Sequence, residues 1–284
     1  MNKQRAETAA WFLAGDSLPN PEGKPNQDAT YYTPEPLFTP SGCPTALALV
    51  CDGVGSQPGG EEASALAIET LQSILEPLLL QDDLTAERQQ GLLDQALATA
   101  NQAIFQRNQA LDRPPDQRMT TTVVVAWLYA DRAVLAHVGD SRAYAFTLEQ
   151  GLTRLTTDHT ALELDLRRGL ITSEEARSGD YHGGEALTQA LGIREKVSPD
   201  CQVLPLHPGL ILMLCSDGVY KPLGDERLAQ VLAAGGRTLG LFGLFRQKQT
   251  PAEQLSAIKH ELLRQVQRRK GKDDATLVLI HVDQ

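Results

Sequence analysis

Apolar runs that end at an aspartate constrain the fold of this chain more than any other feature. Three runs typical of buried strands, residues 46–51, 133–138 and 210–215, each lead directly into a segment that contains an aspartate. Two further acidic segments, 26–28 and 272–276, lie near the two ends of the chain. A carboxylate at the end of a buried strand loses much of its hydration and needs a strong compensating partner. Several such carboxylates with few basic neighbours indicate bound cations, and ligand sets made only of oxygen select hard ions such as Mg²⁺ or Mn²⁺ rather than zinc.

Hydrophobic periodicity predicts how the remaining segments are organised. Residues 60–80 and 85–111 carry apolar side chains three and four positions apart, which predicts two long helices joined by a short break at 81–83. Residues 121–129 and 133–138 flank a short turn and predict an antiparallel hairpin. Two long helices adjacent in sequence do not fit a β-α-β alternation. They suit two stacked antiparallel sheets that are covered by helices on both outer faces.

Eight segments in a fixed order carry a resemblance to a known family. They are Asn26-Gln27-Asp28, Asp52-Gly53-Val54-Gly55, Met119-Thr120-Thr121-Thr122, Gly139-Asp140-Ser141-Arg142, Leu155-Thr156-Thr157-Asp158-His159, Leu187-Thr188-Gln189-Ala190-Leu191-Gly192, Cys215-Ser216-Asp217-Gly218 and Lys272-Asp273-Asp274-Ala275-Thr276. In this order the chain resembles the metal-dependent serine/threonine protein phosphatases of the PPM family, the protein phosphatase 2C type, in its bacterial form. The resemblance runs from about residue 11 to residue 282.

The resemblance implies an α+β fold, a four-layer αββα sandwich of two antiparallel sheets flanked by helices. Residues 1–284 are then expected to form a single phosphatase domain. A flap-like surface segment is expected at about 159–186. The glycine, leucine and phenylalanine residues at about 234–250 indicate an insertion before a last helix at 252–269. We predict a mobile or partner-docking loop there, with a loop folded over the core as the alternative.

The aspartates are the candidate ligands for metal ions. Asp52 is the candidate to bridge two ions, because the following Gly53 lets its backbone carbonyl approach one of them without a side chain in the way. We expect Asp217 and Asp273 to complete the ligands of one ion, and Asp28 to act on the other side, either directly or by orienting its waters. Asp140 matches the position that shares a third, looser ion with the Asp217 position in bacterial relatives. Asp52, Asp217 and Asp273 are thus the expected catalytic residues.

Three positions depart from the family pattern. The arginine that holds phosphate in the family is replaced by Gly23, so the adjacent Lys24 is the candidate substrate-binding residue, although an ammonium lacks the bidentate fork of a guanidinium. Val54 stands where the eukaryotic branch has a histidine that is a candidate general acid. Asp274 stands where the family usually has asparagine, and whether it contacts metal is left open.

His159 and His182 lie on loop-like segments, where a structural or solvated role is the simpler interpretation.

The expected function is hydrolysis of phosphoserine and phosphothreonine in proteins by a water that a dinuclear Mg²⁺ or Mn²⁺ centre activates. Two alternatives remain open. One is a protein that has kept the fold for binding or scaffolding with weakened catalysis, which the missing arginine favours. The other is a hydrolase of a small phosphate ester. The expected partners are phosphorylated substrate proteins and a serine/threonine kinase, in signalling, with the chain a monomer.

Composition restricts the remaining classes of function. The net charge of −10 disfavours nonspecific binding to nucleic acid, because no basic face offsets the repulsion between carboxylates and phosphates. No apolar stretch reaches the ~20 residues that span a bilayer. The expected location is therefore cytoplasmic, with no role in a membrane.

Overall fold

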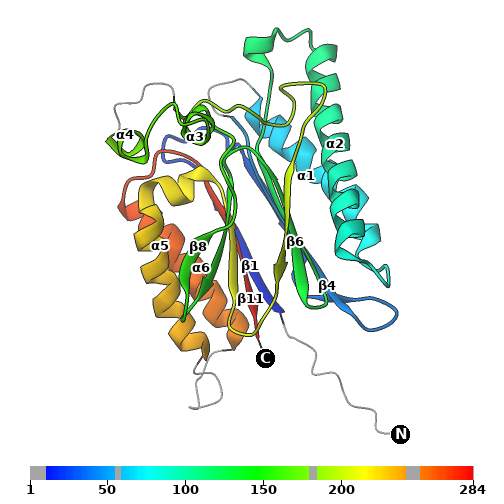
Figure 1. The fold of residues 1–284 in the computed structure, drawn as a ribbon, viewed down its shortest axis with the longest axis vertical. Coiled ribbons are helices and arrows are strands. Elements are labelled where there is room, and N and C mark those ends of the chain that lie inside the picture. The colour runs from blue at the N-terminus through cyan, green and yellow to red at the C-terminus, as the bar shows by residue number, and fades with distance from the viewer. Residues whose placement is uncertain (1–10, 55–58, 179–183, 241–249, 284) are drawn as a thin grey trace, which may run out of the picture.

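The computed structural model describes residues 11–54, 59–178, 184–240 and 250–283. Two antiparallel sheets are stacked on each other, and each carries a pair of long helices on its outer face (Figure 1). This is the αββα sandwich that the sequence predicts, so the fold class is confirmed.

Both sheets are built from strands that pair only in the antiparallel sense. The first sheet has the order β1 (Trp11–Leu18), β11 (Ala275–Val282), β10 (Ile211–Cys215), β7 (Arg142–Thr147), β8 (Gly151–Arg154). The second sheet has the order β2 (Asp28–Tyr32), β4 (Pro44–Asp52), β5 (Val123–Tyr129), β6 (Arg132–Val138), β9 (Asp200–Pro205), and the short β3 (Leu37–Phe38) also pairs with β4.

Two long helices cover each sheet. α5 (Asp217–Gly240) and α6 (Pro251–Arg268) pack on the first sheet, and α1 (Gly60–Leu75) and α2 (Ala86–Ala110) pack on the second. The shorter elements are the helices α3 (Ala161–Arg167) and α4 (Ser173–Ser178) and the 3₁₀ turns η1 (Glu76–Leu78) and η2 (Pro115–Gln117).

The central strands are apolar on both faces because each strand packs against two layers. In β4, Leu47 and Leu49 face the core beneath α1 and α2, whereas Ala48 and Val50 face the other sheet. Burying one leucine side chain stabilises a fold by about 1.5–3 kcal/mol. This double burial explains why the runs that end at aspartates are continuous rather than alternating.

Two predicted elements end elsewhere than the sequence pattern suggested. The helix expected over 60–80 stops at Leu75, and Pro77, which lacks the N–H that a continuing helix needs, lies in the η1 turn. Residues 234–240, expected to begin a loop, continue α5. Gly235 allows close packing between helices, because a Cβ there would lie 2.2 Å from the Ile258 side chain of α6. Residues 241–249, the rest of the predicted insertion, lie outside the described residues.

The sandwich brings the acidic segments to one end. β4 ends at Asp52 and pairs in register with β2, which begins at Asp28, while β10 ends next to the start of β11. Figure 1 shows α3 and α4 near this end, and the start of β1 and the end of β11 at the other. In the described part of the chain, no helix has the length and apolar character needed to cross a membrane.

Candidate metal and active site

Four aspartates from four separate segments line one cavity of about 390 Å³ at this end of the sandwich. They are Asp52 at the end of β4, Asp140 after β6, Asp217 at the start of α5 and Asp273 before β11. We call this space the four-aspartate cavity. The structure thus brings together four of the five aspartates that the sequence predicts as metal ligands.

Asp28, the fifth predicted ligand, lies beside the cavity. It pairs with Asp52 across β2 and β4, and its Oδ2 accepts a hydrogen bond from Ser216 Oγ at 2.7 Å. Burial raises the pKa of the Asp28 carboxyl to about 7; hydrogen bonds from Ser216 and Thr276 oppose the shift, and the charge of Asp217 adds to it. Asp28 is therefore close enough to the cavity to interact with its charges.

The cavity carboxylates have an unfavourable electrostatic environment. Burial raises the pKa of Asp52 well above its usual range, and the charges of Asp28, Asp217, Asp140 and Asp273 raise it further. Burial and then the charge of Asp217 raise the pKa of Asp140 to about 6, and the same two causes raise the pKa of Asp273. Carboxylates that lie together in one cavity in this way need added positive charge to stay ionised near neutral pH. An acidic, all-oxygen ligand set of this kind fits hard divalent cations.

Gly53 is required by the packing of the backbone around it. A Cβ at this position would lie 2.3 Å from the carbonyl oxygen of Gly60 and 2.7 Å from that of Gln27. The Gly53 N–H donates to the same Gln27 carbonyl at 3.0 Å. The glycine therefore lets the start of α1 lie against the end of β4. Its predicted role as a carbonyl ligand for a metal ion stays a prediction.

Two basic side chains that the sequence did not single out also line the cavity, Arg118 and Lys221. Lys221 Nζ lies 2.8 Å from Asp217 Oδ2 and 3.1 Å from Glu185 Oε2. Lys221 follows Asp217 by four residues in α5, and this helical spacing is the signal that could have identified it. The contact supplies part of the positive charge that the aspartates need.

Asp274 accepts three hydrogen bonds from the N-terminal loop. Its Oδ1 accepts from the backbone N of Asn20 at 2.7 Å and from Asn20 Nδ2 at 2.9 Å, and its Oδ2 accepts from the Gln27 N at 2.8 Å. We call Asp274, Asn20 and Gln27 the Asp274 clamp. The sequence left open whether Asp274 contacts metal, and these contacts give it a structural role in holding the loop before β2.

Lys24 lies on this loop, next to the four-aspartate cavity rather than in its wall. Its Nζ is 2.7 Å from Glu22 Oε2, and its side chain is 72% exposed. Lys24 lines a neighbouring cavity of about 560 Å³ that shares Asp273 with the first. Its predicted contact with the phosphate of a substrate stays a prediction.

The turn that carries Asp140 is held by surrounding side chains. Tyr220 Oη donates to the Asp140 carbonyl oxygen at 3.0 Å, and the Arg142 guanidinium lies over the Tyr220 ring, 3.7 Å from its centroid. Arg142 also binds Asp158 with two nitrogens, Nε at 3.0 Å and Nη2 at 2.6 Å. These contacts connect two of the family-like segments, 139–142 and 155–159, and fix the position of the Asp140 backbone.

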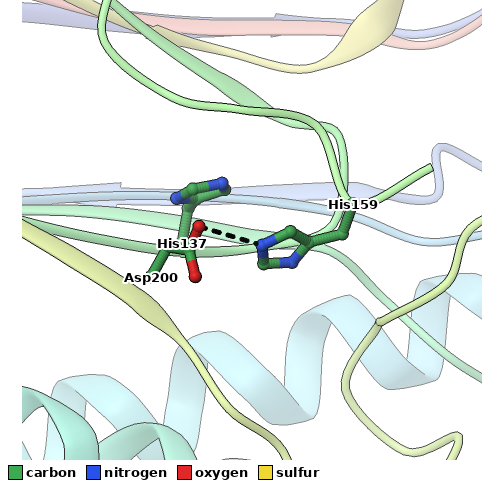
Figure 2. A group of neighbouring side chains, drawn as sticks. All are labelled: His137, His159 and Asp200. Atoms are coloured by element: carbon green, nitrogen blue, oxygen red, sulfur yellow. Dashed lines mark ion pairs between the residues drawn. The ribbon is translucent and has the colours of Figure 1, made fainter. Parts of the chain in front are cut away.

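A second polar group, His137, His159 and Asp200 (Figure 2), is connected to this turn through hydrogen bonds between Gly139 and His159. The two imidazole rings are stacked with their centroids 4.7 Å apart. The Gly139 N–H donates to His159 Nδ1 at 3.2 Å, so the proton of this ring is on Nε2, which lies 3.5 Å from Asp200 Oδ2. His137 Nε2 lies 2.8 Å from the Thr157 carbonyl oxygen and donates to it.

This arrangement determines what the histidines do. A metal ion would need a lone pair on His159 Nε2, where the hydrogen bond from Gly139 places the proton. The group therefore supports the backbone that leads into Asp140, and His159 has the structural role that its sequence context favoured. His182 lies outside the described residues.

Comparison with known proteins shows a consistent pattern over most of the chain. Residues 20–258 match the family model described as Protein phosphatase 2C. The serine/threonine phosphatase stp of Listeria monocytogenes serotype 4b is 30% identical over 187 residues, 66% of this chain and 71% of that protein. The serine/threonine protein phosphatase PstP of Mycobacterium tuberculosis is 31% identical over 238 residues, 83% of this chain and 40% of that protein.

A solved structure has the same architecture. The catalytic domain of a serine/threonine protein phosphatase PstP in complex with two manganese ions has a TM-score of 0.72 and 26% identity to this chain. The match covers 98% of this chain and all of that domain. Sequence and fold are therefore both similar to those of bacterial serine/threonine phosphatases.

Proposed function

The chain belongs to the protein phosphatase 2C family and is a metal-dependent serine/threonine protein phosphatase, and we propose that the four-aspartate cavity is its catalytic centre. One observation carries the proposal. Four aspartates from separate segments line one cavity, and the pKa values of three of them, Asp52, Asp140 and Asp273, are raised, first by burial. A cavity of this kind favours binding of cations.

Each aspartate has a proposed part in binding two inner ions, Mn²⁺ or Mg²⁺, and a third, looser one. Asp52, with the Gly53 carbonyl beside it, would hold the inner pair, and Asp217 and Asp273 would hold one of these two ions. Asp28 would serve the other ion, and Asp140 together with Asp217 would hold the third. Two divalent ions, when bound, supply the acidity that makes a water nucleophilic near pH 7 and neutralise the phosphoryl oxygens.

The protein groups around the ligands keep the centre in place. Ser216 donates to Asp28, and Thr122 Oγ1 accepts from the Asp52 backbone N at 3.1 Å. Thr122 Oγ1 in turn lies 2.6 Å from Ser141 Oγ, next to Asp140. This chain of contacts holds the carboxylates of both sheets in one arrangement. Preorganisation of this kind lowers the cost of assembling a charged site.

The substrates that we propose are proteins phosphorylated on serine or threonine, opposed by a partner kinase. The expected monomeric state and cytoplasmic location stay predictions, as does a single domain over residues 1–284. Two alternatives stay under test: a scaffold with weakened catalysis, which Gly23 at the position of the family arginine favours, and a hydrolase of small phosphate esters.

Hydrolysis of phosphopeptides and of small phosphate esters, measured side by side with and without Mn²⁺, tests the proposal. We expect turnover of phosphoserine and phosphothreonine peptides that requires Mn²⁺ or Mg²⁺ and stops with excess chelator. Turnover that continues in chelator would contradict a metal centre. Mn²⁺ binding without any turnover would favour the scaffold. Turnover restricted to small esters would favour the hydrolase of small phosphate esters.

A further inference from the structure

The Arg118 side chain is a charged group in the wall of the four-aspartate cavity that the proposed metal ligands do not use. This inference rests on the proposed function and concerns how the same site holds its substrate. A phosphoryl group in such a cavity still has oxygens that face the protein. The position where the family has its arginine is Gly23, and a Cβ there would have no atom within 4 Å, so it lies in open space.

Two other basic residues near the cavity are already paired with carboxylates. Lys221 binds Asp217 and Glu185, and Lys24 binds Glu22. In the described part of the chain, Arg118 makes no ion pair with a carboxylate. A half-buried guanidinium without a counter-ion, in the wall of a cavity, is suited to bind an anionic ligand.

The position of Arg118 is fixed by its neighbours. Its Nη1 donates to the Ile193 carbonyl oxygen at 2.7 Å, and its guanidinium lies over the Phe105 ring, 5.0 Å from the centroid. The next residue, Met119, is held through its backbone N and O by the side chain of the buried Asn108, at 2.9 Å each. The guanidinium is therefore oriented before any ligand arrives.

This orientation leaves donors unused. Arginine has five N–H groups in a planar fork, and one nitrogen of Arg118, Nη1, is committed to Ile193. Its Nε is buried and has no hydrogen-bond partner among the described residues. Since Nε is covered by protein atoms, a ligand oxygen in the cavity accepts from the terminal N–H groups that make no hydrogen bond among the described residues.

From these contacts we infer that Arg118 binds the phosphoryl group of the substrate, in the role that the resemblance would give to an arginine at position 23. The guanidinium donates hydrogen bonds to a phosphoryl oxygen that faces the protein wall. Arg118 thus supplies the planar fork that Lys24 lacks, from a different segment of the chain.

The test measures phosphate binding as well as turnover. Arg118→Ala, Arg118→Lys and Arg118→Gln are compared with Arg88→Ala, which removes an exposed arginine from the first turn of α2. For each variant, the readouts are KM and kcat on a phosphothreonine peptide at saturating Mn²⁺, and the inhibition constant of inorganic phosphate. Calorimetry gives the affinity for Mn²⁺, and the melting temperature reports folding.

We expect Arg118→Ala to raise both KM and the phosphate inhibition constant by about tenfold, as expected for loss of one hydrogen bond between charged groups. Affinity for Mn²⁺ should change less than twofold, because Arg118 is no metal ligand. Arg118→Lys should recover part of the loss and Arg118→Gln little of it. Arg88→Ala should match the wild type.

Unchanged phosphate inhibition in Arg118→Ala, or in Arg118→Gln if the alanine variant does not fold, would overturn the inference. A larger effect of Lys24→Ala than of Arg118→Ala would overturn it too and assign the phosphate to Lys24. An inactive wild type would instead contradict the proposed function. In that case, titration of the Mn²⁺-loaded protein with inorganic phosphate still decides whether Arg118 binds the anion.

Discussion

The four-aspartate cavity and the Asp274 clamp hold their carboxylates in opposite ways, although Asp273 and Asp274 are neighbours in the chain. Asp274 is 3% exposed and accepts three N–H groups from Asn20 and Gln27. Asp273 is exposed and accepts one, from the backbone N of Asp274, and its pKa is raised by partial burial and by the charge of Asp217. The number of donors that reach a carboxylate distinguishes a structural group from one that needs a cation.

The largest effect on activity should come from removing the carboxylate of Asp52 or of Asp217 from the cavity. Asp52→Ala and Asp217→Ala are each expected to lower kcat on p-nitrophenyl phosphate by at least about a thousandfold, because much of the catalysis comes from the ions. Far-ultraviolet circular dichroism should stay nearly unchanged. If a variant keeps half of the wild-type rate, its residue is not a ligand of the metal centre. The four-aspartate cavity and the Asp274 clamp would then differ less than we propose.

The pH dependence of stability should differ between the two regions in the metal-free protein. The pKa of Asp28 is about 7 in the folded protein, against about 3.9 in an unfolded chain, so between these values the folded state binds more protons than the unfolded state. The contribution of Asp28 to stability is therefore lost as pH rises through this window, by up to about 1.4 kcal/mol per pH unit.

Urea unfolding of the wild type and of Asp28→Asn at several pH values measures this effect. The advantage of the variant should grow from pH 5 to pH 7 without metal and should disappear at saturating Mn²⁺. An advantage that shrinks with rising pH would show that the neighbours of Asp28 stabilise it as an anion.

Substitutions in the Asp274 clamp should lower the stability of the protein rather than its catalytic activity. Asp274→Ala leaves the donors of Asn20 and Gln27 without their acceptor and is expected to lower the free energy of unfolding by about 2 kcal/mol. Asp273→Asn is the matched control, since it removes a charge from the cavity and should cost activity with little loss of stability. Equal loss of activity in Asp274→Asn and Asp273→Asn, with stability intact, would mean that Asp274 is a metal ligand.

The smallest effect should come from the edge of the cavity. Asp140→Ala is expected to weaken the third ion, to slow turnover several-fold and to raise the Mn²⁺ requirement, because the inner pair has its own ligands. The backbone of this turn should stay in place, since Tyr220 binds the Asp140 carbonyl rather than its side chain. Calorimetry that shows loss of all metal binding would make Asp140 a ligand of the inner pair.

Local patterns predicted much of the fold. Helical periodicity placed α2 within a residue of its observed ends at Ala86 and Ala110, and the last helix, expected at 252–269, is α6 at Pro251–Arg268. The secondary-structure prediction was wrong where glycines serve a contact between two elements rather than a loop. The glycines of 234–240 indicated a loop, but Gly235 is a contact between helices, which depends on Ile258 in another element.

The amino-acid sequence by itself determined the two-sheet fold, the family and the aspartates that meet in the cavity, because apolar runs and short acidic motifs are local features of the chain. Only the tertiary structure decided which charges are satisfied. The donors around Asp274 lie about 250 residues away in sequence, and Arg118 gains its place in the cavity from Ile193 and Phe105. Hydrogen bonds and ion pairs act over a few ångströms of space, so contacts between distant segments set the role of each buried charge.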